Sequence, residues 1–171
     1  MHNELKKIVI GTANLENQYG FLKISMQNRR DITLVLGGTS SGKSAWAECY
    51  LLEQGQSVGY IATAQAFDAE MKEKIAQHRA RRGQEWITRE APLDLISCFD
   101  AFTAEQPILL DCATLWLSNL MLAKKNISAE SSALITHLKT YTGKLVIVSN
   151  ETGLCVVPHT KIGRDFQKAQ G

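Results

Sequence analysis

Short apolar runs alternate with amphipathic stretches along this chain of 171 residues. Runs of a few residues rich in Val, Ile and Leu are typical of buried strands, whereas apolar residues three and four positions apart indicate helices. The predicted strands cover residues 32–36, 57–62, 86–88, 108–111 and 144–149. The predicted helices cover residues 43–53, 68–82, 93–102, 114–123, 131–141 and 161–169. This alternation predicts an α/β fold with a mainly parallel sheet flanked by helices.

The two ends of the chain depart from this pattern. Residues 1–30 are an N-terminal extension, which we expect to be disordered or a non-native start, with Met26 as an alternative first residue. Within it, residues 7–10 could form an extra strand. Residues 31–171 are the predicted folded domain. We expect its C-terminus to be cut short, because the chain stops at Gly171 directly after a helix, where an α/β sheet usually receives another strand.

Composition narrows the class of protein. With 44% hydrophobic and 21% charged residues, the chain fits one folded domain with a sizeable core. A net charge of +2 gives no argument for nucleic acid as a partner, and no transmembrane segment is predicted, because no apolar run approaches the ~20 residues that span a bilayer. The four cysteines are widely spaced, without a C-x-x-C pair. We therefore expect reduced, buried thiols and a cytoplasmic location.

A glycine-rich motif follows the first predicted strand and precedes the first predicted helix. Residues 37–44 read GGTSSGKS, which is the pattern G-x-x-x-x-G-K-[ST]. In this context backbone N–H groups cradle phosphates, the lysine reaches the β- and γ-phosphates, and the hydroxyl ligates Mg²⁺. The motif therefore predicts that the protein binds a nucleoside triphosphate through Gly37, Gly38, Thr39, Ser40, Ser41, Gly42, Lys43 and Ser44.

Polar residues also follow the other predicted strands, where a parallel sheet collects its ligand-binding residues at one edge. Asp111 ends the apolar run at 108–111 and is predicted to hold Mg²⁺ directly or through water; the alternative is a helix N-cap. Asn150 and Glu151 follow the last strand. They could position a substrate hydroxyl or a metal-bound water, or form a capped turn.

His78 lies on the predicted helix 68–82. Met71, Ile75 and His78 recur at helical spacing, so the imidazole is predicted to lie on the stripe that faces the sheet. On spacing alone, a histidine there is usually a hydrogen-bonded core residue. Three arginines place positive charge beside it, and could clamp phosphates or form a solvated basic helix end: Arg79, Arg81 and Arg82.

Taken together, the segments resemble the bifunctional adenosylcobinamide kinase / adenosylcobinamide-phosphate guanylyltransferase family of cobalamin biosynthesis. The resemblance extends from Ile32 to Gly171. It is carried by GGTSSGKS at 37–44, YIATAQ at 60–65, DAEM at 68–71, IAQHR at 75–79 with Arg82 and Trp86, EAP at 90–92, DCATLWLSN at 111–119, SNETG at 149–153, Val157-Pro158 and Gly163-Arg164. A phosphate loop alone is widespread, whereas this ordered set is specific.

The resemblance implies a RecA-like P-loop NTPase fold and two reactions. The hydroxyl of the aminopropanol arm of adenosylcobinamide is phosphorylated by ATP or GTP. GMP then passes from GTP to the new phosphate through a guanylylated histidine, which gives adenosylcobinamide-GDP and pyrophosphate. A homotrimer with the site between subunits is also implied.

The resemblance also assigns roles to residues. The guanylylated histidine matches His78, and Lys43 serves both reactions. Ser44 and Asp111 would hold Mg²⁺. Further contacts to GTP are implied for Ala62, Thr63, Ala64, Arg79, Arg82, Glu90 and Asp111.

Three departures from the family pattern bear on activity. Cys155 replaces a glycine, Gln167-Lys168 replaces an Arg-Asp pair, and the stretch beyond Gly171 is absent. We therefore expect weakened GTP binding and trimer assembly. The alternatives are another P-loop small-molecule kinase, in which His78 is structural, and a nucleotide-binding regulatory or assembly ATPase, including a catalytically impaired relative.

Overall fold

The computed structural model describes residues 7–11, 31–53, 55, 57–153 and 156–170. The expectations for the rest of the N-terminal extension, for Cys155 and for Gly171 lie outside these residues. None of the helices in the described part of the chain has the length and apolar character that a membrane crossing requires.

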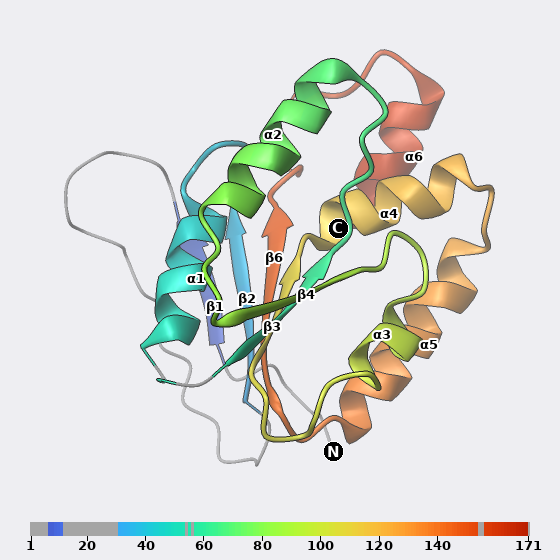
Figure 1. Cartoon of the computed structure of the whole chain (residues 1–171). Helices are drawn as coiled ribbons and strands as arrows, with labels where there is room; N and C mark the ends of the chain where they lie inside the picture. The colour runs from blue at the N-terminus through green and yellow to red at the C-terminus, as the bar shows by residue number, and fades with distance from the viewer. Residues whose placement is uncertain (1–6, 12–30, 54, 56, 154–155, 171) are drawn as a thin grey trace.

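A six-stranded sheet forms the centre of the molecule (Figure 1). Its order is β1-β2-β6-β5-β3-β4, and every pair of neighbouring strands is parallel. All five predicted strands are present, and the extra strand expected within the extension pairs with β2. The strands are β1 (Lys7–Gly11), β2 (Asp31–Gly37), β3 (Val58–Ala62), β4 (Trp86–Glu90), β5 (Ile108–Asp111) and β6 (Lys144–Asn150).

Helices cover both faces of this sheet (Figure 1). Helix α1 lies on one face, α3, α4 and α5 lie on the other, and α2 extends across the carboxyl end of the sheet. The helices are α1 (Lys43–Leu52), α2 (Ala69–Ala80), α3 (Leu95–Phe99), α4 (Ala113–Leu122), α5 (Ile127–Thr140) and α6 (Lys161–Gln170). This arrangement confirms the predicted fold class, a P-loop NTPase fold with a mainly parallel sheet flanked by helices.

Two helix boundaries differ from the prediction because of local caps. Helix α5 begins at Ile127 rather than at residue 131, since the Asn126 side chain accepts a hydrogen bond from the Ala129 N–H. Helix α3 begins only at Leu95, after Asp94, whose carboxylate caps the Ser97 N–H. The capping side chains of Asp94 and Asn126 therefore determine where the two helices begin.

Each central strand contributes to two apolar cores. In β5, Ile108 and Leu110 lie in the cluster beneath α3 and α4, whereas Leu109 lies in the cluster beneath α1. All three side chains are at most 1% exposed. This burial on both faces explains why the strands read as continuous apolar runs.

The free cysteines agree with the prediction in part. Cys98 and Cys112 are buried thiols, whereas Cys49 is exposed on α1, contrary to the expectation of burial. Neither apolar cluster of the described residues includes Cys49, because the inward face of α1 is formed by Ala47 and Leu51.

The strand ends that carry polar residues are direct neighbours. Gly37 pairs in register with Asn150, and Ala62 pairs with both Asp111 and Glu90. The predicted gathering of these residues at one sheet edge is therefore confirmed.

Candidate active site

The phosphate loop connects β2 to α1 through two residues in the left-handed region. Ser40 has φ 58° and Gly42, the N-cap of α1, has φ 82°. Gly42 adopts this conformation without the penalty that a Cβ imposes, whereas Ser40 bears it as local strain. Successive backbone N–H groups in such a turn, at the start of a helix, form an anion-binding concavity.

Lys43 lies folded over this loop. Its ammonium donates to the Gly38 carbonyl oxygen at 2.5 Å and approaches Ser41 Oγ at 3.5 Å. Burial lowers the pKa of Lys43, and the nearby Cys112 and Asp111 oppose that shift. The residue is 9% exposed, so its charge lies in a site with little water.

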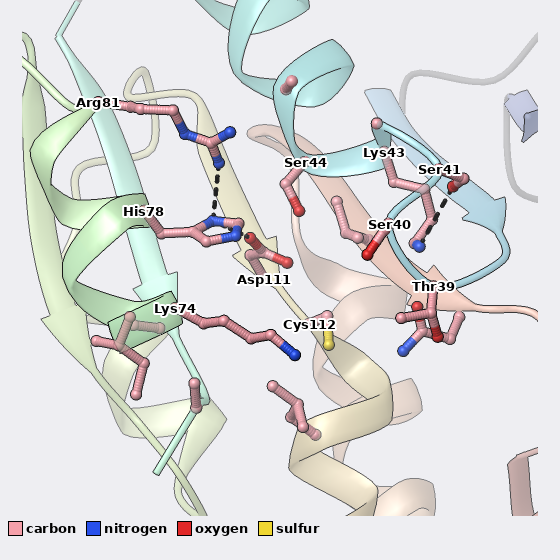
Figure 2. Close-up of a pocket in the computed structure, with 18 of the residues that line it drawn as sticks. Thr39, Ser40, Ser41, Lys43, Ser44, Lys74, His78, Arg81, Asp111 and Cys112 are labelled. Atoms are coloured by element: carbon pink, nitrogen blue, oxygen red, sulfur yellow. Dashed lines mark hydrogen bonds and ion pairs between the residues drawn. The ribbon is translucent and has the colours of Figure 1, made fainter. Parts of the chain in front are cut away.

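A pocket of about 490 Å³ opens between the phosphate loop and α2 (Figure 2). On one side it is lined by residues 39–45. On the other it is lined by Met71, Lys74, Ile75 and His78 of α2 and by Arg81, the C-cap residue of that helix. Asp111 and Cys112 lie between the two sides (Figure 2). The loop that is suited to phosphate and the helix that carries the imidazole therefore face each other.

The predicted stripe on α2 is present, but it faces this pocket rather than the sheet. Met71, Ile75 and His78 are the half-buried positions of the helix, and none of the α2 residues is fully buried. The sequence pattern detects a water-poor side of a helix but not what lies opposite, which here is the pocket.

Asp111 is fixed by a neighbouring strand. Tyr60 donates from its hydroxyl to Asp111 Oδ2 at 2.7 Å, and burial together with the Asp111 carboxylate raises the pKa of Tyr60, so the phenol keeps its proton. The alternative role of Asp111 as a helix cap is wrong, since Cys112 is the N-cap residue of α4. Burial raises the pKa of the Cys112 thiol to about 11, so it remains protonated.

His78 reaches the pocket with a half-exposed ring. Its Nδ1 lies 3.9 Å from Asp111 Oδ2 and 3.0 Å from the Arg81 Nη2 (Figure 2). Burial lowers the pKa of His78, Asp111 opposes the shift, and Arg81 and Arg82 lower the pKa further. The imidazole is therefore neutral at neutral pH, which is the protonation state of a nucleophile.

Not every predicted nucleotide-binding residue lines the pocket. Ala62, Ala64, Arg82 and the phosphate loop from Thr39 to Ser44 do, but Gly37, Gly38, Thr63, Arg79 and Glu90 do not. Thr63 is 0% exposed. Its hydroxyl donates a hydrogen bond to the Cys112 carbonyl oxygen and accepts one from the Cys112 N–H. Arg79 and Glu90 form an ion pair in a second hollow of about 330 Å³, which Arg82 also lines.

Three residues of the site were missed by the sequence analysis. Tyr60 and Lys74 line the pocket, and Glu48 lies behind Arg81, 3.9 Å from its Nη2. Lys74 had a detectable signal, since it lies one helical turn before His78 on the same face.

The two polar residues after the last strand have different positions. Asn150 lines the pocket, whereas the Glu151 carboxylate accepts a hydrogen bond from the Gly153 N–H at 2.5 Å, which agrees with the alternative of a capped turn.

The donor set fits a magnesium ion shared with phosphates. Ser44 and Asp111 both line the pocket and offer oxygen ligands, which Mg²⁺ prefers. Within the described ranges, no group of three or more His, Cys, Asp or Glu residues could hold a metal by itself. Two protein oxygens with phosphate and water ligands are the usual arrangement for Mg²⁺ in such sites.

A buried amide supports the loops around α2. Asn119 is 3% exposed and donates to the carbonyl oxygens of Thr63, at 2.7 Å, and Pro92, at 3.0 Å. It therefore ties the loop before α2 to the segment after β4.

We expect Asn119→Leu to destabilise the fold by about 2–4 kcal/mol, because it leaves two buried carbonyls without a donor. The melting temperature should fall by roughly 5–15 °C in thermal unfolding followed by circular dichroism. Gln106→Leu is the control, since its amide bond to Ser57 lies at the surface and should matter by less than about 0.5 kcal/mol. Equal melting temperatures for the two variants would contradict this role.

Known proteins resemble this chain over most of its length. The family model described as cobinamide kinase / cobinamide phosphate guanyltransferase matches residues 33–171. The bifunctional adenosylcobalamin biosynthesis protein CobP of Pseudomonas aeruginosa is 45% identical over 141 residues, which cover 81% of this chain and 82% of that protein. The Escherichia coli protein CobU, with the same descriptive name, is 33% identical over 154 residues, which cover 81% and 84%. Among solved structures, the RadB recombinase aligns with 81% of this chain and 70% of its own at 16% identity and a TM-score of 0.43.

Proposed function

This chain belongs to the cobinamide kinase / cobinamide phosphate guanyltransferase family, and we propose that the pocket between the phosphate loop and α2 serves both reactions. The enzyme phosphorylates cobinamide with a nucleoside triphosphate and transfers GMP to the resulting cobinamide phosphate. The observation that supports a single site is the position of His78, directly across the pocket from the phosphate loop (Figure 2).

In the kinase step, the phosphate loop and Lys43 hold the triphosphate of ATP or GTP. The substrate hydroxyl oxygen attacks the γ-phosphorus and its proton passes to solvent. The bond between the γ-phosphorus and the β–γ bridging oxygen breaks, and the nucleoside diphosphate leaves. Most of the catalysis comes from positioning and from neutralising phosphate charge, for which Lys43 and the loop N–H groups are suited.

In the transfer step, the neutral His78 imidazole attacks the α-phosphorus of GTP. A P–N bond forms, the α–β bridging P–O bond breaks, and pyrophosphate leaves with the electron pair. An oxygen of cobinamide phosphate then attacks the same phosphorus, and the electron pair of the P–N bond returns to the imidazole. The second step regenerates free His78.

Ser44 and Asp111 would hold Mg²⁺ beside the phosphates. The ion would neutralise charge on the triphosphate in both reactions. Arg81 and Arg82, which line the pocket next to His78, add fixed positive charge near the α-phosphate.

We also propose the finer features that the resemblance implies. The corrinoid carries its adenosyl group, and the enzyme is a cytoplasmic homotrimer. Free thiols at Cys49, Cys98 and Cys112 are compatible with a reducing compartment. The exposed side chains of Val156, Val157 and Ile162 offer apolar surface for contact between subunits.

The function is tested by supplying adenosylcobinamide, Mg²⁺ and GTP labelled in either the α- or the γ-phosphate. We expect γ-label to enter the corrinoid before α-label does, and α-label to be carried by the protein before it reaches the corrinoid. A small-molecule kinase of another kind would transfer only γ-label, and an assembly ATPase would release phosphate without labelling the corrinoid.

Sedimentation equilibrium of the same preparation tests the trimer, and a monomer would contradict it.

A further inference from the structure

Glu48 is a buried carboxylate that has no role in the two reactions as described above. It lies on α1, one helical turn after Ser44, and is 9% exposed. Its Oε1 has no hydrogen-bond partner among the described residues. Buried polar atoms are almost always hydrogen-bonded, so an exception beside an active site requires an explanation.

The carboxylate forms a long ion pair with a guanidinium that also contacts the reactive histidine. Arg81 Nη2 lies 3.9 Å from Glu48 Oε1 and 3.0 Å from His78 Nδ1 (Figure 2). A guanidinium can only donate hydrogen bonds, so Nδ1 must accept this one. The proton of the neutral ring is then on Nε2, and Arg81 engages the lone pair of Nδ1.

This arrangement leaves the imidazole without a free nucleophilic nitrogen. Nε2 carries the proton and Nδ1 is occupied by Arg81. A second partner competes for Nδ1, since Asp111 Oδ2 lies 3.9 Å from it. A carboxylate there would accept a hydrogen bond from a protonated Nδ1 and leave the Nε2 lone pair free, as carboxylates do for other catalytic histidines.

We propose that Glu48 is a positioning residue for GMP transfer, which receives Arg81 when that side chain releases His78. The proposal rests on the proposed function, in which His78 carries GMP. Arg81 needs to move only about 1 Å closer to Glu48 to form a charge-assisted hydrogen bond of the usual length.

The ring proton passes from Nε2 to Nδ1 through solvent in the pocket, with no net change in protonation. The Nε2 lone pair then forms the P–N bond, and pyrophosphate leaves with the electrons of the broken P–O bond. Asp111 faces the Nδ1–H of the resulting imidazolium and stabilises its charge.

The kinetic test measures the single-turnover rate of protein labelling by α-labelled GTP. Glu48→Gln keeps the shape and an acceptor oxygen but loses the charge, so labelling should slow by roughly 10-fold with GTP affinity unchanged. In an Arg81→Gln background, the same change should alter the rate by less than about twofold, because Glu48 acts only through Arg81. Glu53→Gln, at the exposed end of α1, is the matched control and should label as the parent chain does.

The second readout is the tautomer of His78, observed by NMR of ¹⁵N-histidine-labelled protein. In the protein alone we expect the Nε2–H form of His78. A non-hydrolysable GTP analogue should shift His78 to the Nδ1–H form, and this shift should be large in the parent chain and small in Glu48→Gln. The role of Glu48 is overturned if its 10-fold effect persists without Arg81, or if both proteins show the same tautomer with the analogue. Absence of label in the parent chain would instead refute the guanylyl-histidine of the proposed function, which the tautomer measurement does not require.

Discussion

The variant His78→Ala is expected to lose covalent GMP labelling by at least ~10³-fold while it still phosphorylates adenosylcobinamide. The reason is that the imidazole forms the P–N bond of the transfer step, whereas no bond of the kinase step involves it. The kinase rate should therefore stay within about threefold of the parent rate. Both rates are measured with GTP labelled in the α- or the γ-phosphate.

The control for this prediction is His159→Ala, because His159 is exposed and does not line the pocket. It should leave both rates unchanged. If His78→Ala were labelled as strongly as the parent chain, another residue would carry GMP. If it lost both activities equally, the imidazole would be a structural residue of the pocket.

The variant Lys43→Met should lower both reactions together, by roughly 10²- to 10³-fold each. Lys43 is the buried cation of the phosphate loop, and both reactions develop charge on phosphates that the loop holds. Methionine fills much of the same space and carries no ammonium group that must be desolvated on folding, so the fold should be retained. Single-turnover rates for the two labels and a thermal melt check this expectation.

Lys72→Met is the matched control, since Lys72 is exposed on α2 and lines no part of the pocket. A Lys43→Met protein that kept its full rate of GMP labelling would contradict a shared site. The transfer step would then hold its triphosphate elsewhere.

Local sequence patterns predicted the features that depend on neighbouring residues in the chain. The strand before the phosphate loop, the loop itself and the helix after it follow one another directly, so their geometry is encoded within residues 31–52. The edge position of Asp111 was also predictable, because parallel strands bring their carboxyl ends together.

Features that depend on tertiary neighbours were not predictable. Glu48 reads as an ordinary polar residue of α1, and only the fold brings Arg81 next to it. Thr63 was expected to contact GTP, but its hydroxyl is hydrogen-bonded to the backbone of Cys112, the residue that follows the adjacent strand β5. The orientation of the His78 stripe was wrong for the same reason, because helical periodicity does not specify what the helix faces.

The proposed function depends on His78, opposite the phosphate loop, accepting GMP. The most direct test is to incubate the protein with α-labelled GTP and Mg²⁺, digest it, and sequence the labelled peptide by mass spectrometry. We expect one GMP on His78, attached through a P–N bond that is labile in acid and stable in alkali. If the corrinoid acquires GMP while the protein carries no label, or carries it on another side chain, His78 is not the residue that transfers GMP.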